Sequence, residues 1–178
     1  MILMKFEEKA IKRMRDYELD IFIATFYKET QVGRSISSSI LKDRKKIDKQ
    51  GFKKGLMQSI SKLRKLVDKE TIKNIDIRNE IKKLSEYTGV SIGQSQKVIN
   101  VYLKVYCLIL NKPIKILKEL DCPLDSITMG GKDKIKNVNT IEQYEEYQKE
   151  FEENYGIRIL KDVDYDEERL REFSQIKD

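Results

Sequence analysis

The longest run of apolar residues in the chain lies between residues 93 and 110. From residue 98 to residue 110 only Asn100 and Lys104 interrupt it. A helix that is apolar on nearly every side is stable only when other segments cover it. The run is shorter than the roughly 20 residues that cross a bilayer. We therefore predict the central helix of a soluble core, with no membrane partner.

The few polar residues of this helix fall on one face. Lys97, Asn100 and Lys104 are spaced i, i+3 and i+7, and side chains at these spacings are neighbours on a helix surface. We expect this stripe to face either solvent or a binding site.

Helical periodicity extends over much of the remaining chain. It predicts a helix that starts after Gly51, a second within residues 68–86, and a third that begins at a capping-box pattern formed by Thr140 and Gln143. The apolar positions are Phe52, Leu56, Ile60, Leu63 and Val67 in the first, Ile77, Ile81 and Leu84 in the second, and Tyr144, Tyr147 and Phe151 in the third.

These elements predict an all-α fold, a single-domain multi-helix bundle around the central helix. Further helices are expected at residues 5–15, 36–47 and 166–173, a helix or strand at 19–26, and a short extended segment at 157–163. We divide the chain into a basic core of residues 1–136 and an acidic helical segment of residues 137–178 that packs on the same domain.

Charge is distributed unevenly along the chain. Residues 42–69 carry eleven basic and three acidic side chains, whereas residues 141–178 carry six basic and thirteen acidic ones. Clustered cations bind a polyanion by releasing its counterions, so DNA is the expected partner, unless the run is only a solvated surface. The residues expected to contact phosphates are Lys42, Arg44, Lys45, Lys46, Lys53, Lys54 and Lys104.

Composition narrows the chemistry further. The chain has no histidine, which excludes Ser-His-Asp and Cys-His catalysis and imidazole metal sites. Cys107 and Cys122 lack a metal-ligand spacing, so we predict no metal site and no cofactor. The absence of a leader pattern predicts a cytoplasmic protein, and abundant charged residues are typical of heat-adapted proteins.

Glycines bound a predicted hairpin before the central helix. Gly89 and Gly93 allow a close backbone approach, and the helix start adds a partial positive charge, so these two residues with Gln94 and Ser95 are candidates for phosphate contacts. The alternative is an ordinary turn between two helices, because glycine is common just after a helix end.

Residues 77–128 resemble a known family. A hairpin, a lysine near the start of an apolar helix (Lys97 in Gln-Ser-Gln-Lys-Val-Ile) and a later Pro-Leu-Asp at an expected helix start (Asp125) occur in the order found in helix–hairpin–helix DNA glycosylases. The likeness is greatest to their archaeal 8-oxoguanine branch. The chain departs from the family pattern in having no proline in the hairpin, a lysine that lies four residues after Gly93 instead of two after the last glycine, and no tryptophan.

The resemblance implies a base-excision activity. In that family the lysine attacks the sugar C1′ and forms a Schiff base, and the aspartate assists expulsion of the base; these roles fall on Lys97 and Asp125. An amine is a nucleophile only when it is neutral, which an apolar helix environment favours. We expect the two side chains to face each other across a cleft wide enough for a nucleotide.

The alternative is a non-enzymatic helical module that binds nucleic acid or a protein partner. Lys97 and Lys104 would then extend along the wet stripe of the helix, and Asp125 would be a helix cap.

Overall fold

The computed structural model describes residues 13–14, 17, 49–131 and 135–164, and in this part of the chain it contains helices and no strands. This confirms the all-α prediction. In chain order the elements are α3 (Lys49–Asp68), α4 (Asn74–Thr88), α5 (Ile92–Ile109), α6 (Ile114–Leu117), the 3-10 helix η1 (Ile135–Asn137) and α7 (Ile141–Tyr155).

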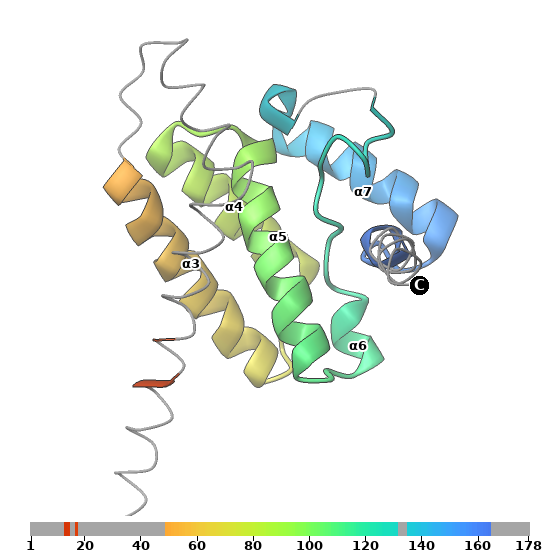
Figure 1. Ribbon diagram of the computed structural model, residues 1–178, viewed down its shortest axis with the longest axis horizontal. Helices are drawn as coiled ribbons and strands as arrows, with labels where there is room; N and C mark the ends of the chain where they lie inside the picture. Colours follow the sequence, from red (N-terminus) through yellow and green to blue (C-terminus); the bar gives the residue numbers. More distant parts are fainter. Residues whose placement is uncertain (1–12, 15–16, 18–48, 132–134, 165–178) are drawn as a thin grey trace, which may run out of the picture.

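Helix α5 occupies the middle of the bundle, between α3 and α4 on one side and the segment that leads to α7 on the other (Figure 1). The predicted apolar stripe of α3 is confirmed, because Phe52, Leu56, Ile60, Leu63 and Val67 are all fully buried. The same holds for the predicted stripe of α4, formed by Ile77, Ile81 and Leu84. Burial of these side chains supplies the main driving force for packing the three helices.

The helix ends follow the predicted capping chemistry in two places. Thr140 accepts a hydrogen bond from the Gln143 amide and forms the predicted capping box of α7. Gly89, with φ of 69°, ends α4 in the left-handed region and donates its amide to the Ser85 carbonyl, the conformation that glycine adopts at no steric cost.

Several predicted boundaries are wrong. Gly51 lies inside α3 rather than at a helix end. Residues 157–163 are not extended, because they form turns followed by a helical segment over residues 160–164. A helix was expected to start near Pro123, but residues 126–131 form turns. Gly130 and Gly131 at the end of these turns have left-handed backbone conformations, which do not continue a helix.

The far end of α5 also differs from the expected burial. Val105, Leu108 and Ile109 are exposed, the last by 76%. These residues lie at i, i+3 and i+4 on one face, and no described helix covers it. In the described part of the chain, no helix is long and apolar enough to cross a membrane.

Several predictions fall outside the described residues. These are the elements at 19–26, 36–47 and 166–173, the element at 5–15 apart from the helical residues 13–14, and the candidate phosphate contacts Lys42, Arg44, Lys45 and Lys46.

Candidate active site

The structure brings Lys97 and Asp125 together. The Nζ of Lys97, on the second turn of α5, lies 3.4 Å from the Oδ2 of Asp125. The two side chains are 13% and 22% exposed, so solvent reaches the pair from one side. The charged groups are in direct contact, and the expected nucleotide-wide separation between them is therefore wrong.

The two oxygens of the Asp125 carboxylate have different partners. Oδ1 accepts hydrogen bonds of 2.9 Å from the amides of Ile127 and Thr128, as at a helix N-cap. Oδ2 points to Lys97. Asp125 thus caps a turn, where the alternative expected it to cap a helix, and pairs with Lys97 at the same time.

Thr128 holds this turn from inside. Its hydroxyl accepts a hydrogen bond of 2.8 Å from the Asp125 amide and donates one of 3.1 Å to the Pro123 carbonyl. The side chain is buried, so both bonds are shielded from water. The orientation of the carboxylate follows from this closed set of backbone and hydroxyl contacts.

Two glutamines, which the sequence reasoning missed, bond the backbone of the segment that leads to Asp125. Gln96 on α5 bonds both backbone groups of Leu124, with distances of 3.1 Å from the Leu124 amide and 3.0 Å to its carbonyl. Gln148 on α7 bonds both backbone groups of Cys122 at 2.8 Å. Residues 121–125 are thus held by side chains from two helices. The local sequence carried no signal for Gln96, because Gln94, Ser95 and Lys97 around it are also polar.

Asn100, which was expected to face either solvent or a binding site, lies inside the molecule. It is 1% exposed, and its amide donates to Gln96 Oε1 at 3.0 Å and to the Tyr144 hydroxyl at 2.8 Å. Tyr144 in turn donates to Asp121 at 2.8 Å. Burial, and then the Asp121 charge, raise the pKa of Tyr144 well above its usual value. In the middle of the polar stripe of α5, Asn100 therefore belongs to a buried hydrogen-bond network.

Lys104 is also inside the molecule. It is 7% exposed and forms an ion pair with Asp162. The prediction that Lys104 contacts a phosphate needs correcting, because residues 157–164 pack over this part of α5 and supply a carboxylate. The spacing of polar residues along α5 could not predict which distant segment would cover Lys104.

The glycine hairpin does not present open amides. The Gly93 amide donates to the Val138 carbonyl at 2.9 Å, and the amides of Gln94 and Ser95 donate to Ser91. Gly93, Gln94 and Ser95 are buried, whereas Gly89 is exposed with its amide bonded to Ser85. The predicted phosphate cradle is therefore occupied by the chain itself, and the ordinary turn describes this connection.

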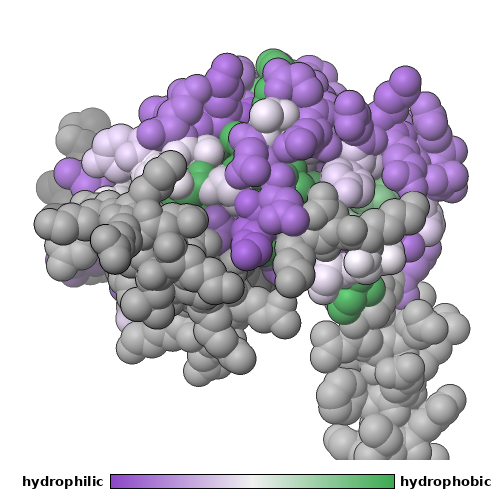
Figure 2. Space-filling view, turned by 90° about the horizontal axis from the view of Figure 1, so that it is seen from above, coloured by the Kyte–Doolittle hydropathy of each residue, from purple (hydrophilic) through white to green (hydrophobic). Residues whose placement is uncertain are grey.

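The predicted cations of α3 lie partly at the surface. Lys53 is half-buried and Lys54 is exposed, as are Lys62, Lys65 and Lys69. Lys62 pairs with Glu80 at 2.6 Å. From above, hydrophilic residues cover most of the described surface, and hydrophobic residues form only small patches (Figure 2).

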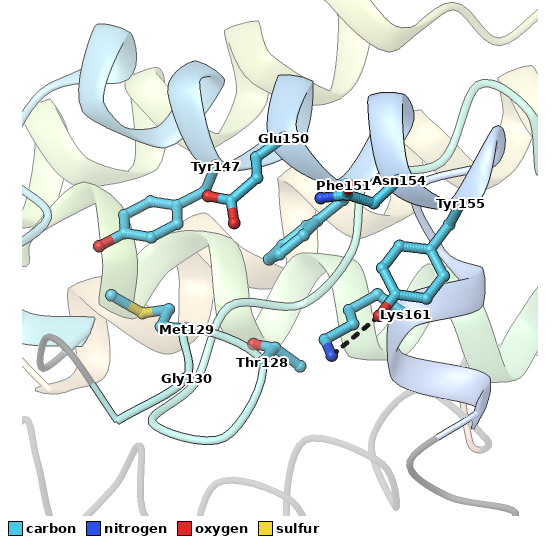
Figure 3. A pocket seen from close by; sticks show the side chains of 9 residues that line it. All are labelled: Thr128, Met129, Gly130, Tyr147, Glu150, Phe151, Asn154, Tyr155 and Lys161. Atoms are coloured by element: carbon cyan, nitrogen blue, oxygen red, sulfur yellow. Dashed lines mark hydrogen bonds between the residues drawn. The ribbon is translucent and has the colours of Figure 1, made fainter.

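A pocket of about 160 Å³ lies behind the Asp125 turn, between residues 128–130 and α7 (Figure 3). Thr128 lines it, while Lys97 and Asp125 do not. The Phe151 ring points into the pocket, and Lys161 bonds the Tyr155 hydroxyl at 3.1 Å. Tyr144 and Phe151 are buried, as expected for core packing, whereas Tyr147 and Tyr155 are half-buried.

Among the described residues, the structure supports neither a nucleophilic cysteine nor a metal-binding site. Burial raises the pKa of the Cys107 thiol to about 11 and raises that of Cys122 further, so both thiols are protonated near neutral pH and are poor nucleophiles. The described ranges contain no group of three or more histidine, cysteine or acidic side chains arranged to hold a metal ion.

Comparisons with models of protein families, with curated proteins and with solved structures found no match to this chain. The site is therefore interpreted from its own geometry.

Proposed function

We propose that this all-α protein binds DNA and excises bases as a glycosylase/lyase that uses Lys97 as nucleophile and Asp125 as assisting acid-base group. The observation that carries the proposal is the 3.4 Å contact between Lys97 Nζ and Asp125 Oδ2, with both side chains partly open to solvent. In a chain without histidine, an amine beside a carboxylate is a combination able to form and resolve a Schiff base.

In the proposed reaction Asp125 Oδ2 takes a proton from the Lys97 ammonium. The neutral Nζ attacks C1′ of the nucleotide, the C1′–N bond breaks, and its electron pair leaves with the base, which takes the proton held by Asp125. Asp125 then accepts a second proton from Nζ and passes it to the ring oxygen as the bond between that oxygen and C1′ breaks. The Nζ lone pair closes an iminium to C1′. Water later hydrolyses this bond. The nucleotide approaches from the solvent side of the pair, since the two groups touch.

The position of the Asp125 carboxylate supports a role beyond a surface ion pair. Its Oδ1 already accepts two amide hydrogen bonds, so the carboxylate keeps its orientation while Oδ2 exchanges a proton. Preorganised groups of this kind cost no reorganisation during the reaction. The exposed lysines of α3 would supply non-specific phosphate contacts.

The experiment is borohydride trapping on duplexes that carry uracil, 8-oxoguanine, hypoxanthine or an abasic site. We expect a covalent protein–DNA complex that Lys97→Ala abolishes. Lys112→Ala is the matched control, because Lys112 forms a similar ion pair with Asp68, at 3.6 Å and with side chains 16% and 25% exposed. This variant should trap like the unmodified chain.

Two results would overturn the enzymatic proposal. One is no trapping on any of the four substrates; the other is equal trapping by Lys97→Ala. Salt-dependent DNA affinity without trapping would favour the non-enzymatic nucleic-acid module, and no affinity at low salt would favour a protein partner.

A further inference from the structure

We infer that Gln96 is a positioning residue that couples the nucleophile helix to the segment carrying the aspartate; this inference rests on the proposed function. Gln96 precedes Lys97 in sequence, and the peptide that it grips, Leu124, precedes Asp125. One buried side chain therefore ties together the backbone next to both members of the pair.

All the hydrogen-bonding capacity of the Gln96 amide is used. Its Nε2 donates to the carbonyls of Gly93 at 2.9 Å and Leu124 at 3.0 Å. Its Oε1 accepts from the Leu124 amide at 3.1 Å and from Asn100 at 3.0 Å. The residue is fully buried. Because Asn100 donates to Oε1, the amide is held in the one orientation that suits the Leu124 peptide.

The consequence for the site is geometric. Residues 121–125 belong to no helix and, in the described chain, no strand lies beside them. Without Gln96 the Leu124 peptide would have two buried unpaired groups and would move to satisfy them. Asp125, one residue later, would move with it, and its Oδ2 would leave Lys97. Misplacement of a reacting group by about 1 Å can cost about 10²-fold in rate.

Gln148 provides a control that separates positioning from stability. It is equally buried and also bonds both backbone groups of its partner, Cys122. Cys122 lies three residues before Asp125. Between these two residues the backbone is held separately by Thr128, whose hydroxyl bonds the Pro123 carbonyl and the Asp125 amide. Loss of Gln148 removes the same kind of hydrogen bonds without releasing the peptide adjacent to the aspartate.

The first test compares Gln96→Met, Gln96→Asn and Gln148→Met, each in the full chain and with its folded fraction measured by circular dichroism. We expect single-turnover trapping at saturating DNA to fall about 10²-fold in both Gln96 variants and less than about threefold in Gln148→Met, with DNA affinity unchanged in all three. The shorter Gln96→Asn keeps an amide, and it remains informative if Gln96→Met does not fold. Equal trapping rates in the Gln96 and Gln148 variants would overturn the inference.

A second measurement does not depend on DNA. Lys97 is methylated with formaldehyde and cyanoborohydride, and its modification rate is read by mass spectrometry. We expect a several-fold faster rate in the Gln96 variants, because Lys97 is released from Asp125, and no change in Gln148→Met. If the unmodified chain traps no DNA, the proposed function fails, and this rate alone decides the positioning role; an unchanged rate in the Gln96 variants would refute it.

Discussion

The amide of Gly93 donates a hydrogen bond of 2.9 Å to the carbonyl of Val138. A Cβ on residue 93 would lie 1.9 Å from the carbonyl oxygen of Ile135. Because Gly93 has no side chain, the backbone of η1 and of Val138 can pack directly against the start of α5. A position that the sequence associates with a phosphate is used for close packing between two parts of the chain.

Gly93→Ala should destabilise the fold, although helix propensity alone predicts stabilisation of about 1 kcal/mol. The new Cβ collides with backbone, and we expect a loss of about 2–3 kcal/mol in urea unfolding. Gly89→Ala, which meets no atom within 4 Å but has φ of 69°, should cost about 1–2 kcal/mol from strain alone. Stabilisation by Gly93→Ala would contradict the η1 contact.

Removal of one partner from the Lys104–Asp162 pair should be costly. Asp162→Ala leaves a buried ammonium without this carboxylate, and we expect a loss of about 3–5 kcal/mol in the free energy of unfolding. The double variant Lys104→Met/Asp162→Leu should recover much of that loss, because it leaves no buried charge at the site. A cost below about 1 kcal/mol for Asp162→Ala would contradict the prediction that this carboxylate is needed to stabilise the buried ammonium.

The two roles of Asp125 should separate in its variants. Asp125→Asn keeps an oxygen for the amides of Ile127 and Thr128 and loses only the ion pair, which we expect to cost up to about 1 kcal/mol. Asp125→Ala also loses the cap and should cost about 1 kcal/mol more. Both should abolish trapping. Equal stabilities in chemical denaturation would show that the Oδ1 contacts contribute nothing.

Stability should fall above pH 9 because of Cys107. Burial raises its pKa to about 11, from 9.0 for an exposed thiol. In the unfolded chain the thiol ionises first, so its contribution is fully present below pH 9 and is lost as the pH rises to about 11. The expected loss over this range is about 2–3 kcal/mol. Cys107→Ala should show a shallower decline in urea unfolding at pH 8, 9, 10 and 11; parallel curves would refute the assignment.

DNA affinity should depend on the exposed lysines of α3. Lys54→Gln should reduce the slope of log affinity against log salt by about 1, as expected for the loss of one phosphate contact. Lys149→Gln, on the acid-rich α7 with its side chain 79% exposed, should leave the slope unchanged. Fluorescence anisotropy with a labelled duplex at several salt concentrations measures both slopes, and an unchanged slope for Lys54→Gln would contradict a phosphate contact by Lys54.

Much of the fold is encoded in local patterns. The stripe from Phe52 to Val67 and the capping box of Thr140 and Gln143 depend on residues within a few positions of one another. Both were therefore predictable from the chain alone. Helix boundaries were less predictable, because helix propensity is a weak guide to a single residue and Gly51 lies inside α3 despite its low propensity.

The candidate site likewise has features that the sequence predicts and features that depend on the tertiary structure. The sequence by itself determined that Lys97 starts an apolar helix and that Asp125 follows a Pro-Leu pair; their proximity was expected only by resemblance. Only the tertiary structure decided that the pair touches, that Lys104 and Asn100 face inward, and that Gln96 holds the Leu124 peptide. The physical reason is range: helix periodicity is set by neighbours along the chain, whereas the partner of a buried polar group is a segment that folding brings from far away.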